Sequence, residues 1–128
     1  MTKFDLEDRL IEFSVLIIKI SSDMIKTKAG NHLSGQIVRS GTSVALNYGE
    51  AQSAESRKDF IHKMKIILKE LRETLVCLKI INKSKLYEDA DMLNKIKVEN
   101  NELISIFVKS IATAESNYRK EKQLKSKN

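Results

Sequence analysis

The chain has 128 residues, a formal net charge of +6 and 31% charged residues, with no proline, no tryptophan and one cysteine. This length suits a single domain, and the composition is that of a helical protein rather than a disulfide-rich or fibrous one. A lone cysteine excludes an internal disulfide, and no group of cysteines and histidines is spaced to bind a metal. No apolar run approaches the roughly 20 residues of a membrane span, and the start lacks a signal-peptide pattern. We therefore expect a cytoplasmic protein that needs no cofactor and does not associate with a membrane.

The first helix is predicted over residues 5–26, because apolar residues recur at alternating spacings of four and three. This seam consists of Leu6, Leu10, Phe13, Ile17, Ile20 and Met24. A second apolar line, Ile11, Ile18 and Ile25, lies about 110° from it at about 100° per residue. The line either widens the core stripe or packs against another subunit. Residues 27–31 are predicted as a turn, with Gly30 ending the helix.

The second helix, predicted over residues 32–51, carries a polar seam beside its apolar stripe. The residues of this polar seam are Gln36, Ser40, Ser43, Asn47 and Glu50, with Arg39 close to the same face. Polar side chains at a core edge need hydrogen-bond partners, so we expect close packing and hydrogen bonds across the bundle. A network between subunits or a ligand contact is the alternative. A catalytic serine would need a positioned base, and the sequence offers none, so we expect no enzymatic activity.

The third helix is predicted to begin after residues 53–56, where Ser56 and Asp59 resemble a capping box, and to end at residues 82–85. Its apolar seam is again heptad-like. Nearly opposite lies a basic strip made of Lys58, Lys65, Lys69, Arg72, Lys79 and Lys83. These cations span roughly 37 Å at about 1.5 Å per residue. They form either an ordinary solvated face or a surface that follows a phosphate backbone.

The fourth helix is predicted over residues 87–118, with a weak and kinked middle at residues 98–101. The remaining residues, 119–128, are predicted as a frayed basic tail that supplies +4 of the charge and includes Arg119, Lys120 and Lys122. We expect the phenylalanines, Phe4 among them, to lie in the core. Aromatic residues do not interleave with the cations of the third helix, as a base-stacking groove would require. Short connections make neighbouring helices antiparallel, so residues 1–118 predict an all-α, up-down-up-down four-helix bundle.

Several short motifs, in this order and spacing, resemble the bacterial four-helix bundle proteins of the 23S rRNA intervening-sequence family. They are Gln36-x-x-Arg39-Ser40-x-x-Ser43-Val44-x-x-Asn47, Glu50, Ser56-Arg57-x-Asp59-Phe60 and Lys69-Glu70-Leu71-x-Glu73-Thr74. The likeness covers about residues 4–115. At 49–51 this chain has Gly-Glu-Ala where many members have Ala-Glu-Gly.

The resemblance implies an antiparallel four-helix bundle that assembles as a homopentamer. It also implies kinship with the accessory variability determinant of diversity-generating retroelements, a basic pentamer that works with a reverse transcriptase and nucleic acid. With the basic strip, this favours a non-enzymatic oligomer that associates with RNA, DNA or a ribonucleoprotein partner. The alternative is a protein-interaction adaptor or structural oligomer without a nucleic-acid role.

Overall fold

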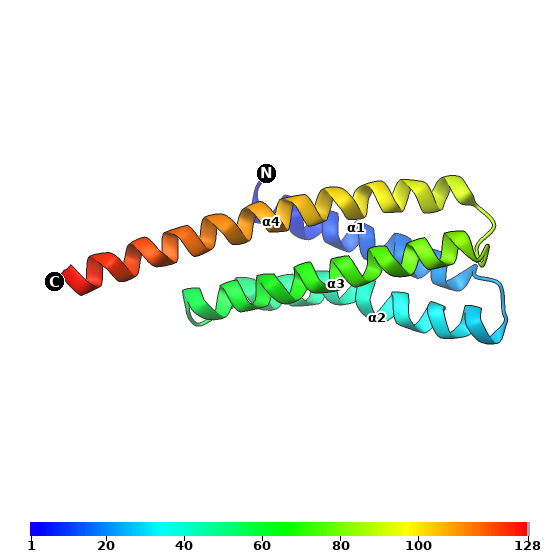
Figure 1. Ribbon diagram of the computed structural model, residues 1–128, viewed down its shortest axis with the longest axis horizontal. Helices are drawn as coiled ribbons and strands as arrows, with labels where there is room; N and C mark the ends of the chain where they lie inside the picture. The colour runs from blue at the N-terminus through cyan, green and yellow to red at the C-terminus, as the bar shows by residue number, and fades with distance from the viewer. Residues whose placement is uncertain (128) are drawn as a thin grey trace.

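The computed structural model describes residues 1–127 and contains four helices joined by short connections. They are α1 (Lys3–Ser22), α2 (Lys28–Gln52), α3 (Arg57–Lys83) and α4 (Ala90–Lys127). Each helix runs back along its predecessor, and α4 extends well past the start of α3 (Figure 1). The described residues contain no strand. The predicted all-α, antiparallel four-helix bundle is confirmed.

Side-chain caps define where three of the helices begin. Thr2 and Asp5 form a complete capping box at α1, with Thr2 Oγ1 accepting from the Asp5 N–H at 3.2 Å. The hydrogen bonds that Asp5 accepts from the Thr2 backbone and side chain lower the pKa of its carboxyl group. At α3, Ser56 Oγ accepts from the Asp59 N–H at 3.0 Å. Each cap satisfies a backbone donor that has no partner inside the helix.

The connection between α1 and α2 differs from the prediction. α1 ends at Ser22, and α2 already begins at Lys28, with Thr27 as its N-cap. Gly30 therefore does not end the first helix. It lies in the first turn of α2, where its N–H donates to Thr27 Oγ1 at 3.0 Å. The threonine cap was the local signal that the prediction missed.

The last helix also departs from its predicted bounds. It starts at Ala90 rather than residue 87 and continues past residue 118 to Lys127, and residues 98–101 remain helical. An ion pair between Arg57 Nη2 and Glu121 Oε1 (2.7 Å) ties this extension to the start of α3. Residue 128 of the predicted tail lies outside the described residues.

The heptad seams of the sequence form the core. All six residues of the first predicted seam are buried, five of them in α1 and Met24 just after it, and Phe107 of α4 is completely enclosed. The Phe107 ring meets Tyr48 edge-on, with centroids 6.0 Å apart and an interplanar angle of 89°. Burial of Tyr48 raises the pKa of its phenol, which stays a neutral core group. Phe4, predicted as core, is instead 67% exposed, because it lies one heptad before Ile11 on the outer face of α1.

Gly41 allows α1 and α2 to approach closely. A Cβ at this position would lie 2.7 Å from Ile17 Cγ2, and Ile17 is fully buried. Across the same contact, Ser14 Oγ donates to the Leu10 and Gly41 carbonyls at 2.9 and 3.2 Å. The small residues of α2 therefore bring two helix backbones together.

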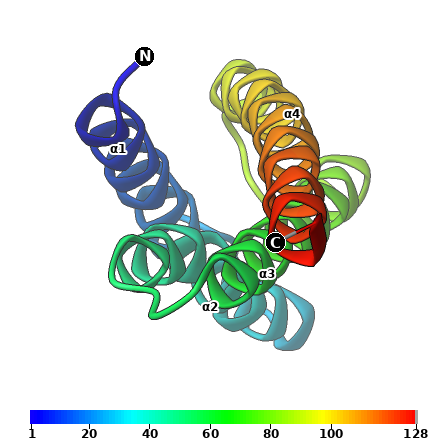
Figure 2. The same cartoon turned by 90° about the vertical axis from the view of Figure 1, so that its left-hand side faces the viewer.

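The contact between α1 and α4 is the weakest among the neighbouring helices, and the two ribbons stand apart in the end-on view (Figure 2). Arg9 bridges them. Its Nε and Nη2 donate to Glu99 at 2.8 and 2.6 Å, and its Nη2 also reaches Glu102 at 2.5 Å. The hydrogen bonds to Glu99 raise the pKa of Arg9, which stays charged.

Candidate functional site

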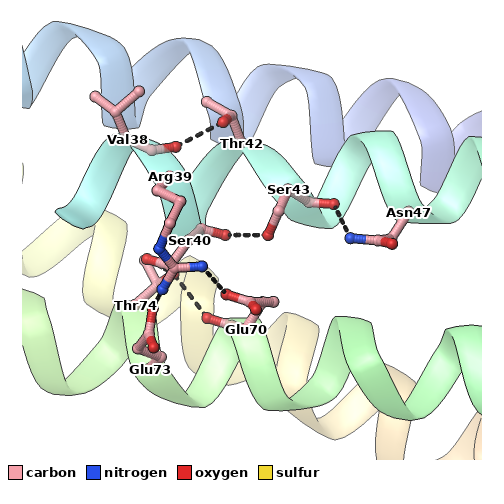
Figure 3. Close-up of polar contacts among 9 residues, drawn as sticks. All are labelled: Val38, Arg39, Ser40, Thr42, Ser43, Asn47, Glu70, Glu73 and Thr74. Atoms are coloured by element: carbon pink, nitrogen blue, oxygen red, sulfur yellow. Dashed lines mark hydrogen bonds and ion pairs between the residues drawn. The ribbon is translucent and has the colours of Figure 1, made fainter. Parts of the chain in front are cut away.

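The polar seam of α2 faces α3 of the same chain (Figure 3). At its centre, Thr74 Oγ1 lies 2.8 Å from both Ser40 Oγ and the Glu70 carbonyl oxygen. Ser40 and Thr74 are almost completely buried. Their hydroxyls satisfy each other inside the bundle, as a polar pair in a core requires.

Two of the remaining seam residues bond to the backbone of α2 itself instead of reaching across the bundle as predicted. Ser43 Oγ donates to the Ser40 carbonyl, and Asn47 Nδ2 donates to the Ser43 carbonyl, both at 2.9 Å. Arg39 forms ion pairs with Glu70 (3.2 Å) and Glu73 of α3 (Figure 3). Two further predicted residues lie at the ends of the seam: Gln36 is exposed, and Glu50 pairs with Lys63 at 3.4 Å.

We expect the buried hydroxyl pair to be energetically coupled. Thr74→Val should lower the free energy of unfolding by about 1–2 kcal/mol, because the Ser40 hydroxyl then loses its buried partner. Adding Ser40→Ala should restore part of that loss, since both polar groups are then gone. Urea denaturation of the two single variants and the double variant measures the coupling. Strictly additive losses would show that the hydroxyls do not interact.

A hollow of about 440 Å³ opens between α2 and α3 beside this pair. It is lined by His32, Leu33, Gln36, Ser40, Glu73, Val76, Cys77 and Ile80. Burial and then the negative charge of Glu73 raise the pKa of the Cys77 thiol, whereas a nucleophilic cysteine needs a lowered one. Ser40 is bonded to Thr74 rather than to a histidine. The hollow therefore has the character of a packing groove with a polar rim.

The predicted line of isoleucines faces outward, with Ile11 and Ile18 on α1 and Ile25 in the connection that follows it. Ile11, Ile18 and Ile25 are 46%, 47% and 39% exposed, so they do not widen the core of this chain. Phe4 and Val15, also exposed, extend the same face. We call this set of five residues the α1 apolar stripe.

The basic strip is exposed along the whole outer face of α3. Lys65 Nζ lies 3.4 Å from Glu115 of α4. The other five cations form no ion pair with any side chain that the structure describes. Uncompensated lysines on one face produce a positive potential there.

The extension of α4 adds Arg119, Lys120 and Lys122 to this end of the molecule. Arg119 lines one small hollow together with Lys58 and Lys65 of α3. Lys79 and Lys83 lie at the opposite end of α3, so the predicted cations are arranged in a row and not in one cluster. One aromatic ring of α4 nevertheless lies beside the strip, because Tyr118 lines the same hollow and Lys122 Nζ stands 4.7 Å from the centre of its ring. Tyr118 lies in the fourth helix, so no pattern within the third could reveal this neighbour.

The described part of the chain carries neither a metal-binding cluster nor a membrane-spanning helix. No group of three or more His, Cys, Asp or Glu residues there is arranged to hold a metal ion. None of its helices combines the length and the apolar character that crossing a membrane requires.

Sequence and structure comparisons relate the chain to known proteins. The family model of the 23S rRNA-intervening sequence protein matches residues 3–109. A crystal structure of a protein of unknown function, from the S23 ribosomal protein family of Bacteroides thetaiotaomicron, is 31% identical, with a TM-score of 0.79. The match covers 88% of this chain and 99% of that one. No curated protein matches the chain. The match over most of its length shows that the chain belongs to the 23S rRNA-intervening sequence protein family.

Proposed function

We propose that the protein is a non-enzymatic, oligomeric bundle that associates with RNA through the basic strip of α3 and the adjoining end of α4. The observation that carries this proposal is the row of exposed lysines and arginine, most of them without an acidic partner among the described side chains. Lysine ammonium groups suit contact with phosphates, whose spacing and charge do not depend on base sequence. The strip is therefore expected to bind a backbone with little sequence preference.

The α1 apolar stripe supports the oligomeric part of the proposal. Five exposed apolar side chains, four of them on one face of α1, are more than a solvated helix face normally carries, and burial in an interface would remove them from water. Repeating the basic strip around a ring would also multiply its contacts with one RNA. We propose a homo-oligomer, with five subunits as the family resemblance suggests. Native mass spectrometry tests this, and a 14.6 kDa monomer at micromolar concentration would contradict it.

We predict that RNA affinity falls steeply with salt and with charge reversal in the middle of the strip. A triple variant, Lys65→Glu, Lys69→Glu and Arg72→Glu, should reduce the slope of log K against log salt by about 3, because about three phosphate contacts are lost. Fluorescence anisotropy with a labelled RNA, titrated at several salt concentrations, measures both quantities.

The matched control reverses three exposed lysines that lie off the strip: Lys28→Glu, Lys95→Glu and Lys109→Glu. The control variant changes the net charge by the same amount as the strip variant. Loss of local contacts therefore weakens binding in the strip variant alone, whereas a general charge effect weakens binding in both. Binding that is insensitive to salt, no binding near about 50 mM salt, or an equal loss in the control would contradict the proposal.

The hollow between α2 and α3 favours a second candidate function, that of a protein-interaction adaptor. Val76 and Ile80 are 55% and 46% exposed at its edge, and such apolar groups can receive a helix of another polypeptide. The partner we propose for this candidate is another polypeptide with no nucleic-acid role, which would lay the apolar face of a helix in the hollow. Purification of a stoichiometric protein complex free of nucleic acid would favour this candidate over the first.

A further inference from the structure

One end of the basic strip differs from the rest, because an aromatic ring lies there. Lys58, Ile61 and Lys65 on α3 and Glu115, Tyr118 and Arg119 on α4 enclose a hollow of about 210 Å³. Ile61 is 8% exposed and gives the hollow an apolar base, while the cations form its rim. The extension of α4 past residue 118 helps to keep this arrangement in place, since Glu121 pairs with Arg57 at the start of α3.

We infer that this hollow receives an unpaired base of a single-stranded RNA, stacked on Tyr118, while the adjoining phosphates lie on the basic strip. The inference rests on the proposed function and specifies the form of its ligand. Sites for single strands combine a cationic groove with an aromatic ring, because every base has a face that stacks. This hollow combines both features, and the rest of the strip has only cations.

The chemistry of the individual side chains supports a base rather than a simple anion. Tyr118 is partly exposed, and Lys122 holds a cation 4.7 Å from the centre of its ring, which places a positive charge beside the ring. The Glu115 carboxylate would repel a phosphate inside the hollow, yet it can accept a hydrogen bond from the amino group of a base. Lys65 Nζ, 3.4 Å from Glu115, sits at the junction between the hollow and the strip.

Duplex RNA cannot use this site in the same way. Its bases are paired and stacked on one another, so it offers the protein phosphates, 2′-hydroxyls and base edges but no free base face. The strip alone would bind both forms electrostatically, and the ring adds a contact that only a single strand can make. The protein is therefore expected to prefer single-stranded over duplex RNA, and Tyr118 is the source of the preference.

The experiment compares wild type, Tyr118→Leu and Tyr118→Phe, using a short single-stranded RNA that contains a fluorescent adenine analogue, and the duplex of the same sequence. Tyr118→Leu should weaken single-strand binding by roughly 5- to 150-fold, the range for losing one stacked base, and leave duplex binding unchanged. Tyr118→Phe keeps the ring and should retain wild-type affinity. Stacking should also quench the analogue in the wild-type complex, a readout that does not depend on any variant.

Two results would overturn the inference, and they differ from failure of the proposed function. If wild type binds RNA with the predicted salt dependence but Tyr118→Leu binds the single strand equally well, the strip acts without the ring. The same conclusion follows if the analogue stays unquenched. If wild type binds neither RNA, the proposed function fails and this inference fails with it. Thermal unfolding of each variant checks that the bundle is intact.

Discussion

Phe107→Ala is expected to lower the free energy of unfolding by about 3–5 kcal/mol. The side chain is completely buried and packs edge-on against Tyr48, which links α4 to α2. Removing the ring loses its transfer free energy from water and leaves a cavity that neighbouring helices fill only in part. Urea denaturation followed by circular dichroism measures the change.

Val108 provides a matched control on the same helix. It is 42% exposed, so Val108→Ala should change the free energy of unfolding by no more than about 0.5 kcal/mol. All variants are compared at one protein concentration, because assembly adds to the apparent stability of a subunit. A loss below about 1 kcal/mol for Phe107→Ala would show that this part of the core does not pack as described.

The sequence predicts the bundle well because heptad spacing is a local property that tertiary packing does not override. In α1 and α3 the apolar seams are buried and the basic strip faces outward, as their periodicity indicates. Asn100 shows how such a pattern also tolerates a polar core residue. It is fully buried, and assigning its amide with the nitrogen toward the Leu71 carbonyl lets it donate there at 3.0 Å and accept from the Leu75 N–H at 3.3 Å.

The features that the sequence did not predict depend on contacts between elements far apart in the chain. Tyr118 joins Lys58 only because α4 passes the start of α3. The exposed Phe4 and the buried Leu86 likewise reflect where each segment meets its neighbours. The connection after α1 is fixed by a hydrogen bond from the Ile25 N–H to the Leu86 carbonyl at 2.9 Å, which links it to the turn between α3 and α4. No spacing rule within a single helix contains this information.

Gly30→Ala is expected to lower the free energy of unfolding by at least about 3 kcal/mol. Helix propensity alone predicts the opposite sign, a gain of up to about 1 kcal/mol for alanine over glycine inside a helix. The clash decides the outcome, because a Cβ at residue 30 would collide with the carbonyl oxygen of Ile25. That oxygen belongs to the backbone, whose N–H is bonded to Leu86, so relieving the clash must move the connection and its partner turn together. Urea denaturation measures the loss.

Gly35, one and a half turns further along α2, is the control that separates the clash from propensity. A Cβ at residue 35 has no neighbour within 4 Å, so Gly35→Ala should stabilise the protein by about 0.5–1 kcal/mol. The two substitutions are chemically identical and lie in the same helix, and only their surroundings differ. Opposite signs would establish that Gly30 is needed for the approach of the α1–α2 connection to α2. A gain in the free energy of unfolding at both positions would contradict that close approach, because it would show that residue 30 has room for a Cβ.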